Sequence, residues 1–544
     1  MPNHNSIKMN TFNPQSELKL TQTKDIDTVQ LMDRYQYSTE TKVIIEKENL
    51  LPVGLLQRLH SAYPQYSGLS ESSKFLFNDK KQYSGLKGFR EIVEILAGNG
   101  IVLDKQRERE LFVEVYRFMA TKHVLNSINW ANFKEDSVFQ LVFPQPGMIR
   151  KDIVDAYLNA GSEEKKQQII KDYITETNPH DGKQKLNKPI FKNDSGKYEV
   201  VEGSQHKYPQ CHLIFDVQTQ YCFAFCTYCF RHAQVRGDED MFVQKDIHQI
   251  HKYLKQHKEV TDVLITGGDA GYLTADRFEK YINPIIEDAE LNHIKTIRLG
   301  TRVLTYNPDL ILSKSYEKML NLFKKLNDNG VQLVFMSHFS TPREILNPTT
   351  IAAIRRLRAF GAVVKSQSPI MNHISLFTKP DGKVDVDKSA QNWIDLGNLL
   401  AMLSIGFHSI YCARPTGEHH YFTAPLADIN KIFSKVYRSL ASINRPSRYI
   451  TMTSSAGKIS LIGTVELNGE KLFVLKFNEG RNMEWIDKVY LAKYDEKENT
   501  IEKLKPYGAE KYFFEDELIE IERQLHDAIQ ENILNVQSSL KYDQ

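Results

Sequence analysis

Hydrophobic residues in the middle of the chain recur in two alternating rhythms. Segments of one kind repeat apolar residues at helical spacing and end in glycine or another turn signal. Segments of the other kind are short, β-branched-rich apolar runs, predicted to be strands, at 212–218, 262–268, 296–303, 331–339, 363–369 and 408–414. Six strand–helix alternations indicate a parallel sheet with crossover helices. Since a full barrel has eight units, the pattern predicts an α/β fold with a partial (β/α)6 TIM-like barrel, whose chemistry lies at the C-terminal ends of the strands.

The segments before this core have a different pattern. Residues 1–30 are polar and aperiodic, which predicts a disordered arm. A mainly helical N-terminal region follows over 31–205, and a polar stretch at 175–207 predicts a loop at its end. Apolar residues at helical spacing mark three segments of this region, 88–98, 107–120 and 152–174.

The barrel core is expected to span 206–440. After it, the pattern turns to strands over 441–505, where Asn468-Gly469 between two alternating runs is a strong hairpin signal. A C-terminal helix is expected within 506–544, with an apolar stripe on one face. Such a stripe packs either on its own domain or on a partner helix.

Composition narrows the class of protein. Hydrophobic residues make up 41% and charged residues 25% of the chain, as in ordinary soluble globular proteins. The 70 basic and 68 acidic residues leave a net charge of +2, which gives no case for a nucleic-acid partner. The longest apolar run is too short to cross a bilayer, and the N-terminal residues lack a signal pattern. Few, clustered cysteines fit a reducing compartment, so we expect a cytoplasmic protein with no membrane partner.

Three of the five cysteines, Cys222, Cys226 and Cys229, form a C-x3-C-x2-C group directly after the first strand of the repeat. Structural zinc sites usually have four ligands, so three thiolates are one short. A cubane iron–sulfur cluster bound by three cysteines instead leaves one iron open to an exogenous ligand. Two other interpretations remain: a zinc site completed by a distant residue such as Cys211 or Cys412, and a chance grouping of core cysteines.

This spacing, with the aromatic Tyr228 just before the last cysteine, resembles the motif of the radical S-adenosylmethionine (radical SAM) superfamily. The resemblance implies a 4Fe-4S cluster on Cys222, Cys226 and Cys229 whose open iron chelates S-adenosylmethionine. It also implies that one electron, from a donor such as flavodoxin or ferredoxin, cleaves the sulfonium bond and releases a 5′-deoxyadenosyl radical.

Other segments, within roughly residues 200–460, are similar to the lysine 2,3-aminomutase family. One is the Gly267-Gly268-Asp269 group at the end of the second strand, where glycine lets the backbone approach a ligand closely. The resemblance implies contacts with S-adenosylmethionine for six residues, Gly267, Gly268, Asp269, Arg302, His338 and Gln367.

Arg231, two places after the last cysteine, holds the substrate α-carboxylate by the same resemblance. A planar guanidinium suits bidentate binding of a carboxylate. The alternative is an arginine paired with a nearby acid, Asp238 or Glu239.

The family carries a second cofactor, pyridoxal phosphate, on a lysine late in the chain that follows small residues. Here Lys458 follows Ser454-Ser455-Ala456-Gly457. A lysine amine forms a Schiff base with the aldehyde, and small neighbours leave room for the ring. The resemblance therefore implies that Lys458 is a catalytic, pyridoxal-binding residue; a solvated surface lysine is the alternative.

The match departs from the members that act on lysine. Their two aspartates, which bind the distal ammonium, correspond to Ala413 and Thr451, and neither pairs with a cation. Because an unpaired ammonium in a closed pocket costs several kcal/mol, lysine is not the expected substrate, while neutral and acidic side chains remain open. The neighbouring polar residues available to line a different pocket are Arg414, Glu418, His419 and His420.

The residues expected to bind the phosphate group of pyridoxal phosphate also differ from the family pattern. The family has basic residues just before the first strand. Here His206, Lys207 and His212 are available, but the spacing up to Cys222 is longer than the family pattern. No cysteine follows Cys412, so the C-terminal zinc site of some relatives is excluded.

These features together predict a radical SAM enzyme, an aminomutase (isomerase) whose substrate is a small amino acid other than lysine. By the resemblance, the radical abstracts the β-hydrogen, and the amino nitrogen migrates to the neighbouring carbon through a ring intermediate stabilised by pyridoxal phosphate. The sequence leaves open whether the protein forms a homo-oligomer. Two alternatives are kept: a pyridoxal-independent radical SAM enzyme with another hydrogen abstraction, and a non-catalytic zinc-binding protein.

Overall fold

The computed structural model describes residues 26–66, 75–178, 186–193, 195–237, 242–414 and 417–542, with side chains up to residue 530. Most of the arm predicted over 1–30 lies outside these residues, and α1 begins at Thr28. Within the described ranges, no helix combines the length and the apolar character that a membrane crossing requires.

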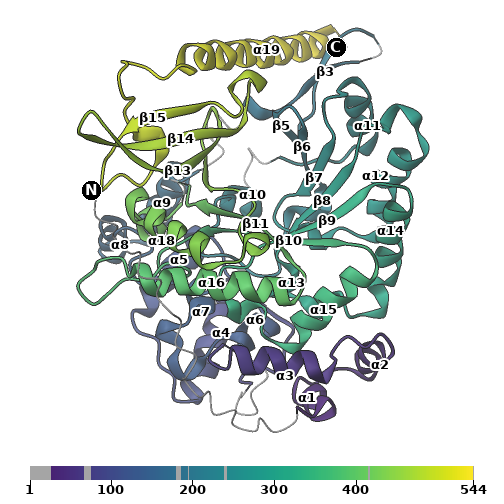
Figure 1. Ribbon diagram of the computed structural model, residues 1–544, viewed down its shortest axis with the longest axis vertical. Coiled ribbons are helices and arrows are strands. Elements are labelled where there is room, and N and C mark those ends of the chain that lie inside the picture. The colour runs from purple at the N-terminus through teal and green to yellow at the C-terminus, as the bar shows by residue number, and fades with distance from the viewer. Residues whose placement is uncertain are drawn as a thin grey trace, which may run out of the picture.

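One mixed sheet of 11 strands runs through the molecule in the order β15-β14-β13-β12-β11-β10-β9-β8-β7-β6-β5 (Figure 1). Its centre consists of six parallel neighbours, which confirm the six predicted strands. They are β6 (Cys211–Phe215), β7 (Asp262–Thr266), β8 (Thr296–Thr301), β9 (Gln332–Ser337), β10 (Val363–Ile370) and β11 (Gly406–Cys412). The predicted α/β fold with a partial barrel of six β/α units is thereby confirmed.

Helices connect these strands and cover one face of the sheet (Figure 1). The predicted glycine stops are present, because Gly330 and Gly361, just after α14 and α15, have φ of 75° and 85°. Along β10, buried Val364, Ser366, Ser368 and Ile370 alternate with partly exposed residues that include Lys365 and Gln367, so one face of the strand is fully buried. The helices are α10 (His232–Arg236), α11 (Ile247–Gln256), α12 (Ala275–Glu287), α13 (Val303–Tyr306), α14 (Glu317–Asp328), α15 (Pro348–Ala359), α16 (Val386–Met402), α17 (His419–Phe422) and α18 (Leu426–Ser439).

The C-terminal strands continue the same sheet rather than forming a separate one. β12 (Ile450–Thr453) pairs parallel with β11, and β13 (Gly457–Leu467), β14 (Glu470–Gly480) and β15 (Val489–Lys493) follow antiparallel. The predicted hairpin at Asn468-Gly469 is confirmed, and both of its residues have positive φ, 52° and 79°. The long helix α19 (Glu515–Tyr542) crosses the top of Figure 1.

The sheet curls until its first strand, β5 (Ser204–Tyr208), comes back toward the C-terminal strands. The Lys207 amine donates a hydrogen bond to the carbonyl of Ser454, a residue 247 positions later in the chain. The Lys458 amine lies 4.9 Å from the centre of the Tyr208 ring. The two ends of the curled sheet thus meet at one inner surface.

The N-terminal region is mainly helical, and α1 to α4, α6 and α7 lie in the lower part of Figure 1. Its helices are α1 (Thr28–Arg34), α2 (Thr39–Lys47), α3 (Val53–Ala62), α4 (Gly85–Gly98), α5 (Gln106–Val115), α6 (Lys122–Ser127), α7 (Ser137–Val142), α8 (Lys151–Leu158) and α9 (Glu163–Glu176). The single helix suggested by 152–174 is two helices, because Ser162 caps α9 by accepting from the Lys165 amide.

Two further predictions for this region were wrong in part. The helical pattern of 107–120 runs past α5 into a strand, β2 (Met119–Thr121), which pairs with β1 (Gln82–Ser84). The polar stretch 175–207 contains β3 (Ile190–Lys192), β4 (Tyr198–Val200) and the edge strand β5 rather than only a loop. Short polar strands such as these have no hydrophobic alternation that would reveal them.

Candidate active site

The three motif cysteines lie on the loop between β6 and α10, after a short 3₁₀ helix, Val217–Gln220. All three are free thiols. Burial raises the pKa of Cys222 well above its usual range, and the nearby Cys229 and Cys226 thiols raise it further. The structure therefore brings the three predicted ligands together at the C-terminal end of the first parallel strand.

The other two cysteines lie elsewhere. Cys211 begins β6, at the opposite end of that strand, where Arg298 donates to its sulfur over 2.8 Å. Cys412 ends β11, and burial alone raises its pKa to about 12. Cys211 therefore lies at the opposite end of its strand from the triplet, and no triplet thiol contributes to the raised pKa of Cys412.

The end of β7 packs directly against the cysteine loop. The Gly268 and Asp269 amides donate to the Thr219 carbonyl over 2.7 and 3.1 Å. A Cβ on Gly267, where φ is +144°, would lie 2.5 Å from the Thr219 hydroxyl, and one on Gly268 would lie 2.6 Å from the Tyr221 carbonyl. The glycine pair is therefore needed for the strand end to touch the loop.

Asp269 uses its carboxylate within the protein. It accepts from the Gly271 amide over 2.8 Å, from the Arg302 amide over 2.9 Å, and from the Thr301 hydroxyl. Burial raises the pKa of Asp269 to about 6, although these donors act in the opposite direction. Asp269 thus ties the end of β7 to the end of β8 beside the cysteines.

Arg302 lies in a buried network next to Cys226. Its guanidinium contacts the Glu344 carboxylate at 3.1 Å and also donates to the Tyr228 hydroxyl. The Tyr306 hydroxyl lies 2.9 Å from the Cys226 sulfur. Glu344 and Tyr306 were missed by the sequence analysis, because neither lies in a recognisable motif.

His338 directly follows β9, and Gln367 lies within β10. Burial, together with the positive charges of Arg302 and Arg231, lowers the pKa of His338 to about 3, so its imidazole is neutral. The Gln367 carbonyl oxygen accepts from the Tyr411 hydroxyl over 2.9 Å. The structure thus brings both residues to the inner face of the barrel.

Arg231 donates to the Thr266 hydroxyl over 2.7 Å and lies 5.1 Å from the Phe230 ring. The guanidinium of Arg414 lies 5.8 Å from the same ring. Burial and the neighbouring Arg414 lower the pKa of Arg231 to about 10. Among the described residues neither arginine forms an ion pair; the alternative partners of Arg231, Asp238 and Glu239, lie outside them.

Lys458 begins β13 and points its amine at Glu479 on β14, with Nζ 2.6 Å from Oε2. Arg448 contacts the other oxygen of Glu479, also at 2.6 Å. Burial by itself lowers the pKa of Lys458, but Glu479 more than offsets this, so the pKa is raised. Gly457 is required beside it, since a Cβ there would lie 2.1 Å from the Glu479 carbonyl.

A set of basic and hydroxyl groups surrounds Lys458. Burial, Arg481 and Arg414 hold the pKa of Lys207 well below its usual range. The Tyr208 hydroxyl, next to both lysines, is buried and has no hydrogen-bond partner. A buried hydroxyl without a partner beside concentrated positive charge suits an anionic, oxygen-rich ligand.

His206 and His212, suggested earlier as companions of Lys207, point away from this set. The His206 ring contacts Tyr253 of α11 instead, and His212 packs on the same tyrosine. The pairing of β5 with β6 is irregular between Gln205 and Tyr208, and there Lys207 reaches Ser454 while His206 faces the helix layer. Of these three residues, only Lys207 lies near Lys458.

The positions that correspond to the ammonium-binding aspartates are closed and uncharged. Ala413 and Thr451 are buried, and the Thr451 hydroxyl has no partner. Glu418 is buried between the hydroxyls of Tyr116 and Tyr173, each 2.7 Å away. The two histidines after Glu418, His419 and His420, are exposed, so the structure does not place them in a pocket.

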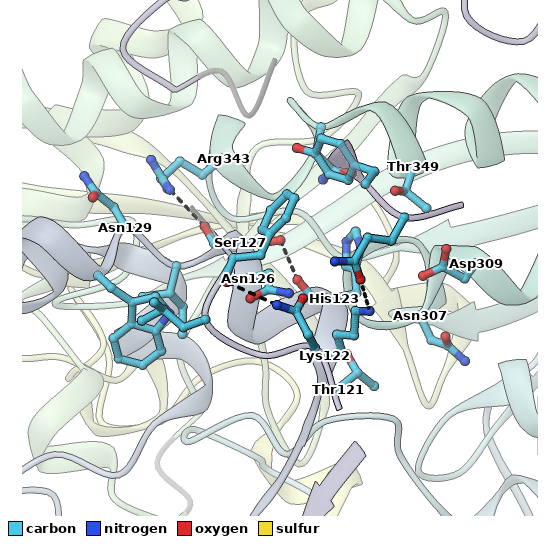
Figure 2. Close-up of a pocket in the computed structure, with 18 of the residues that line it drawn as sticks. Thr121, Lys122, His123, Asn126, Ser127, Asn129, Asn307, Asp309, Arg343 and Thr349 are labelled. Carbon is cyan, nitrogen blue, oxygen red and sulfur yellow. Dashed lines mark hydrogen bonds between the residues drawn. The ribbon is translucent and has the colours of Figure 1, made fainter. Parts of the chain in front are cut away.

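A cavity of about 1370 Å³ lies away from these residues. It lies between the N-terminal helices and the loops that follow β8 and β9. Its lining contains none of the predicted site residues. Figure 2 shows its wall, where Arg343 donates to the Ser127 carbonyl over 2.8 Å, with His123 and Asp309 nearby.

No family model matches the chain. A putative L-lysine 2,3-aminomutase of Aquifex aeolicus is 25% identical over 384 residues, which cover 70% of this chain and 86% of that protein. The L-lysine 2,3-aminomutase of Clostridium subterminale is 27% identical over 41% of this chain and 48% of its own length. The glutamate 2,3-aminomutase of Clostridioides difficile is 31% identical over 31% of this chain and 37% of its own length.

The fold and the site define a partial-barrel protein with a cysteine triplet at the C-terminal edge of its first strand. The comparisons add that the chain is similar to lysine and glutamate 2,3-aminomutases, in agreement with the resemblance that the motifs predicted. The alignment spans most of the Aquifex relative but less than half of the other two.

Proposed function

We propose that the protein is a radical SAM enzyme that moves an amino group between adjacent carbons of an amino acid other than lysine. One observation carries the proposal: three thiols share one loop with no fourth cysteine, beside an arginine that lacks an acidic partner in the described residues. A 4Fe-4S cluster that keeps one iron open needs three thiolates without a fourth. Recognition of an amino-acid carboxylate needs a guanidinium that is not already paired with an acid.

Cys222, Cys226 and Cys229 would hold the 4Fe-4S cluster. A single zinc ion draws its ligand atoms close together. Among the described residues, one set of three potential ligand atoms lies within 4.8 Å of one another, and it contains no cysteine. At least one pair of the three thiol sulfurs is therefore more than 4.8 Å apart. Such a spacing favours a multi-iron cluster over a structural zinc site.

The reduced cluster supplies the electron that converts S-adenosylmethionine into a 5′-deoxyadenosyl radical; flavodoxin or ferredoxin would donate it. The chain's own contribution is positioning. Gly267 and Gly268 bring a strand end against the cysteine loop, and Asp269 fixes that end. The Tyr306 hydroxyl donates to the Cys226 sulfur once that thiol is deprotonated, which stabilises the thiolate.

The residues around Lys458 fit pyridoxal phosphate. Arg414 supplies positive charge for a phosphate, the Lys207 amine would regain its proton beside one, and the Tyr208 hydroxyl supplies an unused donor. When bound, this cofactor supplies a π-system that stabilises an unpaired electron next to the migrating nitrogen. Glu479 holds the proton of the Lys458 amine, and is close enough to receive it when the amine reacts.

The substrate would be neutral or acidic in its side chain. Arg231 would bind the α-carboxylate. The nearby Arg414 repels a second ammonium, and Ala413 and Thr451 offer no carboxylate to neutralise one. Lysine is therefore disfavoured on electrostatic grounds.

A second candidate is a radical SAM enzyme that does not use pyridoxal phosphate. The observation that favours it is the Lys458–Glu479 ion pair, because a protonated amine is not a nucleophile. In that enzyme Lys458 would serve as a structural cation.

The test is anaerobic reconstitution of the full chain with iron and sulfide, followed by dithionite and S-adenosylmethionine. Formation of 5′-deoxyadenosine supports a radical SAM enzyme, and its absence from a brown, cluster-loaded protein contradicts it. Candidate amino acids are then added one at a time, and an isomer with a shifted amino group identifies the aminomutase. Abundant 5′-deoxyadenosine without any such isomer, with and without pyridoxal phosphate, favours the second candidate.

A further inference from the structure

A cluster of histidines lies at the end of the barrel opposite the cysteines. His206 is on β5, and His257 and Glu259 are in the loop that joins α11 to β7. Each of these three residues offers one ligand atom, and the three atoms lie within 4.8 Å of one another. The chain has only 17 histidines. A further one, the fully buried His212, packs beside His206 with ring centres 5.8 Å apart.

The hydrogen bonds of His206 leave one nitrogen suited to a metal. Its Nε2 lies 3.0 Å from the Pro209 carbonyl, which only accepts, so Nε2 carries the proton. Nδ1 of the neutral ring therefore carries the lone pair, which accepts from the Tyr253 hydroxyl over 2.5 Å, and a metal bound at Nδ1 would take the place of that hydroxyl. A backbone carbonyl that fixes the tautomer in this way is the usual support of a metal-binding histidine.

The neighbouring groups also favour a cation. His257 ends α11, where the helix carbonyls are concentrated, and its Nδ1 lies 2.8 Å from a Glu259 carboxylate oxygen. The adjacent Lys258 does not compete, because its amine donates to the Glu290 carbonyl.

His212 supplies an independent indication. It is fully buried, its Nε2 bonds the Ser204 hydroxyl over 3.0 Å, and its Nδ1 has no partner. A buried ring nitrogen next to three potential ligands has no protein group to satisfy it. It suits either direct coordination or a hydrogen bond to a metal-bound water.

We propose that His206, His257 and Glu259 bind a divalent transition metal of the zinc type, with the His212 ring beside the open position. Two imidazoles and one carboxylate are a donor set that zinc uses. Zinc ligands lie about 2.0–2.2 Å from the ion, so the group must contract slightly, and the exposed Glu259 is free to move inward.

The role of this metal is structural. It ties the β5–β6 hairpin to the loop before β7, at a distance from the cysteine triplet. Its ligand His206 is the chain neighbour of Lys207, which points to the opposite face and toward Lys458. A metal on one face of β5 therefore fixes the position of the amine on the other face.

The experiment is a titration of the full chain with Co²⁺, whose spectrum separates thiolate ligands from nitrogen and oxygen ligands. The expected result is one ion per chain with d–d bands of nitrogen and oxygen ligation and no thiolate charge-transfer band for that ion. Glu259→Gln, an exposed substitution that leaves the fold intact, is expected to weaken binding at least about tenfold. His257→Ala is expected to abolish it.

The matched control is His248→Ala, which removes an exposed histidine from the same helix and should leave binding unchanged. Zinc retained after dialysis, measured by elemental analysis, provides the second readout. Equal cobalt binding in the wild type, Glu259→Gln and His257→Ala would overturn the proposal. So would a spectrum that contains only thiolate bands.

Discussion

Lys458 and Glu479 face each other across β13 and β14, and their ion pair is shielded from bulk water. Arg448 binds the second carboxylate oxygen, so Glu479 carries two positive partners. The pair keeps the Lys458 amine protonated, although this amine must be neutral to react with an aldehyde. The balance between these two states of Lys458 is therefore set by one carboxylate.

Glu479→Gln is expected to lower the pKa of Lys458, because burial and Arg448 then act without an opposing charge. The fraction of neutral amine rises, so pyridoxal phosphate should attach to Lys458 faster at neutral pH. Borohydride reduction followed by peptide mass spectrometry measures the attached fraction over time. Equal labelling of the two proteins, or labelling at Lys207 instead, would contradict this, and the exposed Lys383→Ala is the control.

Glu418 gives the protein a pH-dependent stability. Burial raises its pKa to about 7 from 4.5. Between these values the folded state binds a proton that the unfolded state has lost, so the free energy of unfolding falls as pH rises from 4.5 to 7. Glu418→Gln should flatten this part of the stability profile in thermal melts at several pH values, whereas the exposed Glu510→Gln should not. Parallel profiles for wild type and Glu418→Gln would show the prediction to be wrong.

Alanine at Gly267 or Gly268 should push the end of β7 away from the cysteine loop. The added Cβ atoms meet oxygen atoms at 2.5 and 2.6 Å, and Gly267 also has a φ that alanine rarely adopts. We expect each substitution to destabilise the protein by about 2–4 kcal/mol and to reduce the iron bound after reconstitution. Chemical denaturation and iron analysis measure both effects. Gly54→Ala, with open space around its Cβ, is the control and should retain wild-type iron content.

Serine at Cys222, Cys226 or Cys229 should each prevent stable assembly of the cluster, because only three thiolates share the loop. Cys211→Ser and Cys412→Ser should keep about four irons per chain and the brown colour, since those sulfurs lie at other places in the fold. The measurements are iron content and the spectrum of the reconstituted protein. Loss of iron in Cys211→Ser or Cys412→Ser would mean that a fourth thiolate takes part.

The parallel strands could be predicted because each is a continuous β-branched run between turn signals. β5 was not predicted, since its residues Ser204–Tyr208 are mostly polar and its role depends on pairing with β6. The split between α8 and α9 was missed because apolar spacing continues across it, while the local cap at Ser162 decides the break. Hydrophobic periodicity thus predicts buried elements better than edges and caps.

Local motifs predicted which residues carry chemistry but not what surrounds them. Cys222, Cys226 and Cys229 are near each other in sequence, so their grouping is visible in the chain itself. Glu479 reaches Lys458 only through the β13–β14 register, and Lys207 does so only through the curl of the sheet. Strand register and curl depend on packing of the whole fold, which a linear motif does not contain.

The contact between Lys207 and Ser454 has a consequence for biosynthesis. These residues are 247 positions apart, so the cysteine loop leaves the ribosome long before β13 and β14 exist. A nascent chain at that stage has its thiols but lacks the strands that carry Lys458 and Glu479. The curl of the sheet therefore closes only after the last strands have been made, and a product truncated before β13 would lack both Lys458 and Glu479.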